Sequence, residues 1–263
     1  MTSSTQPSWH EGDLPGLRFA PHLVETFQRY LLEEADADTD LEYGVPCQLT
    51  RAAKRVLGAD GAGLCVQTTP EMRLPLGASD AVAATAERLQ FTVGEGPCFE
   101  ALAGRRPIAI TEASMLQRWP VLAVLHQQQT PFRSGLAIPL RAGQLCFGAL
   151  DVYLVQSQPL QGHDVIAGQV IAQCIADILL ETLEPATSGD TTREAVQQVW
   201  DGPSVRARRE VWVAAGMANL ILGLRQDDAL ATLRAQALLG DQSLDDLAHD
   251  IVTGHFDLAE LNL

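Results

Sequence analysis

A run of three arginines within four residues, RARR at Arg206–Arg209, is the first feature of the sequence that suggests chemistry. Arg206 and Arg209 are three residues apart and share one face of a predicted helix, whereas Arg208 points elsewhere. Guanidinium groups bind phosphates and base edges, and they stack on unpaired bases of RNA loops. A solvated helix face with local ion pairs is the alternative, and charge alone favours it. The candidate RNA contacts are Arg206, Arg208, Arg209, Arg225 and Arg234.

The sequence GEGPC, Gly94–Cys98, is a second candidate site. Backbone N–H groups of a glycine-rich loop can hold an anion, but the GxGxxG pattern is incomplete because Phe99 replaces the third glycine. A tight turn that closes over a sheet is therefore the favoured interpretation. For the Cys98 thiol, a buried and unreactive role is favoured over redox chemistry, since no histidine or basic residue lies close to it in sequence.

The sequence predicts no metal site, no cofactor and no catalytic centre. It lacks HExxH, paired cysteines, GxSxG and a Walker motif, and its histidines are scattered. The five cysteines are an odd number, which favours reduced, buried thiols in a cytoplasmic protein. The N-terminus resembles no secretory signal, and Gln169, Gln173 and Asp177 interrupt the longest apolar run, which argues against a membrane span.

The overall charge limits which partners are plausible. In 263 residues, 18 lysines and arginines stand against 33 acids, so the net charge is −15. A surface with this net charge repels nucleic acid and anionic membranes, so any RNA binding must come from a local basic patch. Apolar residues make up 46% of the chain, enough for a substantial core.

Changes in composition and hydrophobic period predict two domains after a disordered tail. The patterns predict an α+β fold for the first domain and an all-helical fold for the second. In the second domain, the helix from Ser204 to Leu222 is expected to place Val213 and Leu220 inside. Ser243 is expected to cap the last helix. The predicted divisions are a tail at 1–18, a first domain at 19–184, a linker at 185–203 and a C-terminal domain at 204–263.

The segment Gly162–Glu184 predicts a long helix with only one narrow polar stripe. A helix that is apolar around most of its circumference must be buried on more than one side. One side is expected to cover the sheet. Another subunit or the first helix is expected to cover the other, and we favour a homodimer seam there.

The first domain resembles a GAF domain, in its order of helices and strands and in several short sequences. The resemblance implies an antiparallel sheet flanked by helices and a small-molecule ligand bordered by the glycine-rich loop. The implied pocket residues are Thr92, Gly94, Glu95 and Cys98. The matching sequences are RLQFTVGEGPCFEAL (Arg88–Leu102), GRRPIAITE (Gly104–Glu112), RSGLAIPLR (Arg133–Arg141) and FGALDVY (Phe147–Tyr153).

The C-terminal domain resembles an ANTAR domain, the three-helix RNA-binding module of transcription antiterminators. The matching sequences are LRAQA (Leu233–Ala237) and SLDDLAHDIV (Ser243–Val252), with Ala214, Gly216 and Met217 in the preceding helix. The resemblance implies a signal-responsive regulator that binds RNA stem-loops of a nascent transcript as a dimer.

Two alternatives remain open. In the first, a sensory or scaffold dimer uses an acidic C-terminal bundle to bind protein, which Ala215 and the acidic loop Asp241–Asp246 favour, because related modules often have basic residues there. In the second, Cys98 serves a redox enzyme.

Overall fold

The computed structural model describes residues 20–37, 44–67, 73–157, 160–183 and 203–260. Its centre is a five-stranded antiparallel sheet in the order β2-β1-β5-β4-β3. The strands are β1 (Gly61–Gln67), β2 (Arg73–Ala78), β3 (Ile108–Thr111), β4 (Ser134–Ala142) and β5 (Leu145–Leu154).

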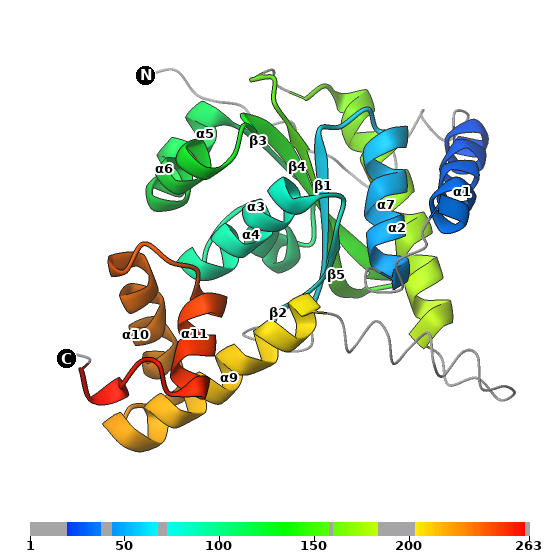
Figure 1. The fold of residues 1–263 in the computed structure, drawn as a ribbon. Helices are drawn as coiled ribbons and strands as arrows, with labels where there is room; N and C mark the ends of the chain where they lie inside the picture. The colour runs from blue at the N-terminus through cyan, green and yellow to red at the C-terminus, as the bar shows by residue number, and fades with distance from the viewer. Residues whose placement is uncertain (1–19, 38–43, 68–72, 158–159, 184–202, 261–263) are drawn as a thin grey trace, which may run out of the picture.

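Helices cover both faces of the sheet (Figure 1). On one face lie α2 and α7, with α1 packed outside them. On the other face lie α3 to α6. The helices of this first part are α1 (Ala20–Ala37), α2 (Gly44–Val56), α3 (Ala81–Val93), α4 (Pro97–Gly104), α5 (Glu112–Arg118), α6 (Pro120–Gln129) and α7 (Gly162–Leu183).

The predicted hairpin from Ser134 to Val155 is confirmed as β4 and β5, which turn at Gly143 with a φ of +58°. Pro139 was expected at an edge or a bulge. It pairs with β5 but lies beyond the end of the short strand β3, next to a register shift between Leu140 and Arg141. Proline has no N–H to donate, and at this position no neighbouring strand needs a hydrogen bond from it.

The helix α7 is sandwiched between β4 and α1. By length and composition alone it is apolar enough to cross a membrane, a test that the core helix of a globular domain also passes. Ile171, Ile175 and Leu179 are buried in the main core with Phe27 of α1. Of the two expected covers for the second side of α7, the structure shows the first helix, and a dimer seam on α7 stays a prediction.

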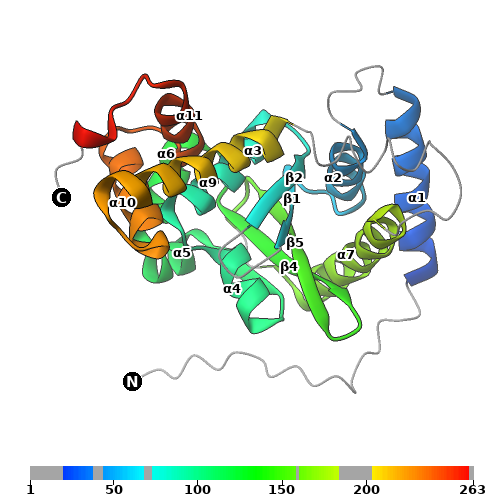
Figure 2. The same ribbon diagram turned by 90° about the horizontal axis from the view of Figure 1, so that it is seen from below.

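The C-terminal part is a three-helix bundle beside the sheet, as Figure 2 shows from below. It consists of α9 (Pro203–Leu222), α10 (Gln226–Leu239) and α11 (Leu244–Thr253), followed by a short 3₁₀ turn, Leu258–Glu260. The Ser243 hydroxyl accepts a hydrogen bond from the Asp246 amide, which confirms the predicted cap.

The inward face of α9 differs from the expected one. Val213 and Leu220 are 51% and 83% exposed, so placing them inside was wrong. The interior positions are Val211, Ala214, Ala215 and Ala218. Alanines at the crossing points let α10 and α11 approach α9 closely, which leaves the larger side chains on the outer face.

Candidate functional site

Five buried polar side chains meet between α3 and the sheet. Glu87 and Gln90 lie three residues apart on α3, and Asp151 and Tyr153 lie two residues apart on β5, so each pair shares a face of its element. Arg73 comes from β2. None of the five is more than 4% exposed. We call this group the polar cluster.

Hydrogen bonds connect the polar cluster throughout. The Tyr153 hydroxyl donates to Glu87 Oε1 over 2.6 Å. Gln90 Nε2 donates to Asp151 Oδ2 and to the Tyr153 hydroxyl oxygen, over 3.0 and 3.1 Å. Arg73 Nη2 donates to Glu87 Oε2 over 3.3 Å. Such a network fixes the orientation of α3 against β5, because each broken contact leaves a buried polar atom unpaired.

The electrostatics of the cluster favour one ion pair and one neutral acid. Burial, followed by the nearby Glu87 carboxylate, raises the pKa of Asp151 well above its ordinary value. Among the described residues, Asp151 Oδ1 and Arg73 Nη1 have no hydrogen-bond partner. Because Asp151 Oδ2 already accepts from Gln90, the proton of the neutral acid lies on Oδ1, so both unpaired atoms can donate to a small polar molecule.

The four predicted pocket residues are spread around one end of α3 rather than lining one cavity. Thr92 is buried and Glu95 is exposed. Gly94 ends α3 with a φ of +84°. The Cys98 backbone N–H donates to Gln90 Oε1 over 3.0 Å, which ties the glycine-rich loop to the polar cluster. The loop therefore makes the tight turn that was favoured.

The bundle docks directly on the end of α3. Phe91, 1% exposed, belongs to the hydrophobic core of the bundle although it lies on α3. The Leu244 amide, in the first turn of α11, donates to the Thr92 hydroxyl oxygen over 3.1 Å. Since the first amides of a helix have no acceptor within it, Thr92 acts as a cap supplied by another domain.

Two of the five candidate arginines are part of this contact. The guanidinium carbon of Arg208 lies 3.1 Å from the centre of the Phe91 ring, and that of Arg234 lies 5.4 Å from it. Arg234 Nε also donates to the Phe91 carbonyl oxygen over 3.3 Å. A Cβ at Gly94 would lie 2.8 Å from the Arg234 guanidinium carbon, so a side chain there would displace the end of Arg234.

The structure does not gather the five arginines on one face. Arg208 is 1% exposed and pairs with Asp245 of α11, with two N···O distances of 3.3 Å. Burial lowers the pKa of Arg208 and raises that of Asp245. The prediction of Arg208 as an RNA contact is corrected for this docked arrangement, because the side chain is inside the protein.

The other arginines are placed differently. Arg225 is exposed and binds Asp228, which agrees with the local ion pairs of the alternative interpretation. Arg206 and Arg209 remain exposed on α9. They are the two that were expected to share a helix face, and with Arg225 they are the exposed members of the predicted patch.

Two cavities flank the docking contact. One of about 250 Å³ lies between α3, α6 and the loop before α11, and Thr92 lines it. The other, of about 240 Å³, lies between β2, α3, α9 and α11, and Glu87 of the polar cluster lines it. Arg88 and Asp246 line both. A ligand in either cavity would touch α3 and the bundle together.

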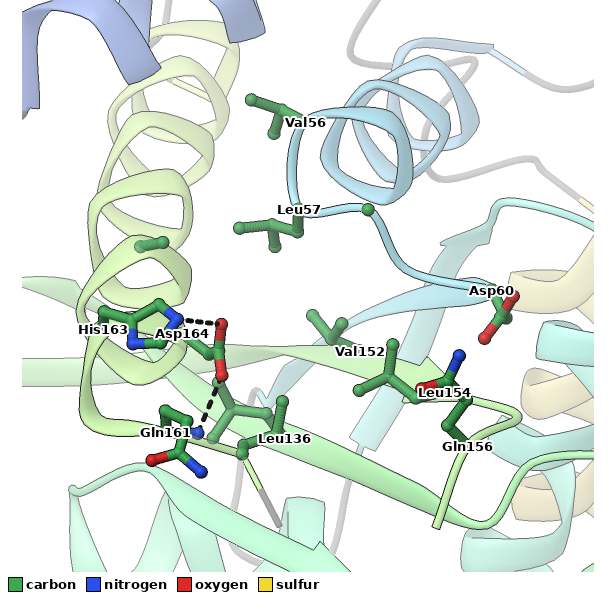
Figure 3. A pocket seen from close by; sticks show the side chains of 13 residues that line it. Val56, Leu57, Asp60, Leu136, Val152, Leu154, Gln156, Gln161, His163 and Asp164 are labelled. Atoms are coloured by element: carbon green, nitrogen blue, oxygen red, sulfur yellow. Dashed lines mark hydrogen bonds and ion pairs between the residues drawn. The ribbon is translucent and has the colours of Figure 1, made fainter. Parts of the chain in front are cut away.

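A larger cavity of about 620 Å³ opens on the opposite face of the sheet, between the end of α2 and the start of α7 (Figure 3). Apolar side chains such as Leu57 and Val152 form part of its wall. Its carboxylates are already engaged, since Asp164 accepts a hydrogen bond from the Gln161 amide and Asp60 accepts one from the Val155 amide. The polar cluster is the stronger candidate for ligand recognition because, among the described residues, its Asp151 Oδ1 and Arg73 Nη1 are buried without a partner.

Within the described residues, no group of three His, Cys, Asp or Glu side chains is placed to hold a metal ion. Sequence reasoning missed Arg73, Glu87, Gln90, Asp151 and Tyr153. The sequence feature that could have identified them is a charged residue within an otherwise apolar segment, above all Asp151 in FGALDVY.

The model of the GAF domain family matches residues 47–179. Among solved structures, the GAF domain of a phosphoenolpyruvate-protein phosphotransferase from Coxiella burnetii is 16% identical with a TM-score of 0.47, covering 62% of this chain and 95% of that one. The corresponding domain from Acinetobacter is 11% identical with a TM-score of 0.42, covering 61% and 94%.

A free methionine-R-sulfoxide reductase from Neisseria meningitidis is 15% identical with a TM-score of 0.38, covering 73% of this chain and 98% of that one. No curated protein matches the chain. The family match ends before the C-terminal bundle.

Proposed function

Because the chain belongs to the GAF domain family, we propose that it is a signal-sensing regulator whose C-terminal bundle binds RNA stem-loops and prevents transcription termination. The proposal assigns sensing to the GAF domain and output to the bundle, whose sequence resembles an ANTAR domain. The role is binding and regulation rather than catalysis, and it places the protein in the cytoplasm, where nascent transcripts are.

The observation that carries the proposal is that α3 serves both domains. Glu87 and Gln90 hold the polar cluster, whereas Phe91 and Thr92, the next residues along, hold the bundle. A small molecule that binds in the adjoining cavity at Glu87 contacts α3 and the bundle together, so its affinity differs between the docked and released states. Differential affinity for the docked and released states then couples ligand to output.

Docking also bears on RNA affinity. In the docked state Arg208 is buried and Arg234 lies against α3, so only part of the predicted patch is accessible. Release of α3 removes the aromatic ring that covers both guanidinium groups. We therefore assign weak RNA binding to the docked state and stronger binding to the released state, in which more arginines reach phosphates.

The proposal includes a homodimer. Two weak RNA-binding modules that are joined bind paired stem-loops more tightly through their effective concentration, without any new contact. Sedimentation of the full chain tests the dimer, and a monomer at all protein concentrations would remove this part of the proposal.

A second candidate function is a sensor whose bundle binds another protein. The residues from 203 to 263 contain five arginines and nine acids, a net charge of −4. The burial of Arg208 against Asp245 favours this candidate, since it removes a guanidinium group from the surface.

Crosslinking in cells followed by sequencing of the bound RNA distinguishes the two candidates. Antitermination predicts enriched transcripts that carry tandem stem-loops upstream of terminators. In vitro, the double variant Arg206→Glu and Arg209→Glu should weaken salt-dependent binding to a tandem stem-loop RNA by at least tenfold. The matched control, Arg29→Glu with Arg106→Glu, changes the net charge equally on the GAF domain and should bind nearly as well as the wild type. Equal affinities for the two double variants would remove the α9 arginines from the site.

A further inference from the structure

Two buried cysteines face each other beside the polar cluster. Cys65 on β1 and Cys98 in the first turn of α4 are 1% and 0% exposed, and their Sγ atoms are 3.4 Å apart. Both are free thiols in this structure. A disulfide requires an S–S distance of about 2.05 Å, so the two sulfur atoms need to approach by roughly 1.4 Å.

The surroundings give the two sulfur atoms different reactivity. A hydrogen bond from Cys98 and the positive charge of Arg73 lower the pKa of Cys65, although burial opposes them. Burial raises the pKa of Cys98 well above its ordinary value. The carboxylates of Glu87 and Asp151 also face this region. Cys65 is therefore the more easily deprotonated sulfur and the better nucleophile of the pair, and Cys98 is the thiol that attacks second.

A third cysteine gives this pair a route to solvent. Cys146 on β5 is partly exposed and packs against the cluster that contains Cys65 and Cys98. Burial raises the pKa of the Cys146 thiol, and the positive charges of Arg141 and Arg105 oppose this only in part. A small oxidant that cannot reach the interior can reach Cys146.

We propose that Cys65 and Cys98 are an oxidisable dithiol that a hydroperoxide converts to a disulfide, with Cys146 as the surface thiol that reacts first. This modification site goes beyond the sensing and RNA binding proposed above.

The reaction proceeds in three balanced steps. Cys146 attacks the hydroperoxide, the O–O bond breaks, and Cys146 becomes a sulfenic acid while an alcohol leaves. The Cys65 thiolate attacks that sulfur, an S–S bond forms and hydroxide leaves as water after taking a proton. Cys98 then attacks the Cys65 sulfur and loses its proton to Cys146, which leaves as a thiol. In total, two thiols and one hydroperoxide give one disulfide, one alcohol and one water.

Disulfide formation acts on α3 through the backbone. The Cys98 N–H donates to Gln90 Oε1, and Gln90 donates to Asp151 and Tyr153. Movement of Cys98 toward β1 changes this contact at the centre of the polar cluster.

The test uses the folded full chain in its reduced form. The protein is exposed to cumene hydroperoxide, free thiols are alkylated, and peptides are analysed by mass spectrometry. The expected result is a peptide pair linked through Cys65 and Cys98 with a loss of about 2 Da relative to the two thiols. Absence of this linked pair, with the protein still folded by circular dichroism, would overturn the proposal.

Two serine variants test the route to the buried pair. Cys146→Ser should slow formation of the linked pair at least tenfold, whereas Cys174→Ser, a change of another half-buried cysteine on α7, should leave the rate unchanged. Equal rates for the two variants would overturn the role of Cys146.

Discussion

Truncation of Phe91 should release the bundle from the GAF domain. Phe91 is fully buried in the core of the bundle, and its ring contacts the guanidinium groups of Arg208 and Arg234. Replacing a buried phenylalanine by alanine costs about 3 to 5 kcal/mol, and loss of a desolvated cation–π contact adds about 1 kcal/mol. If about 3 kcal/mol of this falls on the docking equilibrium, Phe91→Ala increases the released fraction roughly a hundredfold.

Hydrogen exchange at the Leu244 amide reports this equilibrium directly. That amide donates to Thr92 across the interface, whereas the Leu247 amide donates to the Ser243 carbonyl oxygen inside the bundle. In Phe91→Ala we expect exchange at Leu244 to accelerate roughly a hundredfold while Leu247 stays protected.

The control is Phe27→Ala, which removes an equally buried ring from α1 on the other side of the sheet. In this control the ratio of the exchange rates of the Leu244 and Leu247 amides should be the same as in the wild type. Unchanged exchange at Leu244 in Phe91→Ala would refute the reasoning. So would equal acceleration at both amides, because it would mean that the bundle itself unfolds.

Two further changes test the buried charges. Burial, with Arg133 nearby, lowers the pKa of His126 to about 4, so the neutral ring is favoured in the folded state and protonation destabilises it. The unfolding free energy should therefore fall by about 3 kcal/mol as the pH drops from 6.5 to 4. In urea titrations His126→Gln should lack this loss, and an equally steep decline in the variant would assign it to other groups. Asp245→Asn leaves Arg208 buried without its charge partner and should cost about 3 to 5 kcal/mol of stability. The exposed control Asp227→Asn should change stability by less than about 0.5 kcal/mol in the same assay, and similar losses for both would show that the buried pair is not important.

Local signals in the sequence predicted most of the fold. The hairpin turn at Gly143 and the Ser243 cap depend on neighbouring residues only, and both are confirmed. The strand β2 was not predicted, because Pro75 and Gly77 interrupt its pattern. A Cβ at Gly77 would lie 2.7 Å from the backbone of Pro46, so that glycine is set by packing against α2, which the local sequence does not reveal.

The candidate site was harder to predict because it is assembled from distant segments. Arg73, Glu87 and Asp151 meet only after the sheet has formed and α3 has packed on it. The burial of Arg208 depends on Asp245, which lies 37 residues later and arrives with α11. Cys98 was recognised, but its partner Cys65 lies 33 residues away on β1. Charge and spacing therefore suggested an exposed arginine patch, whereas tertiary packing turned part of it into an interdomain contact.

Titration of a tandem stem-loop RNA against the wild type and Phe91→Ala tests the central claim most directly, since that claim is that docking on α3 restrains the bundle. We expect salt-dependent binding that is at least tenfold tighter for Phe91→Ala than for the wild type. Equal affinities, or no binding by either protein, would contradict the account.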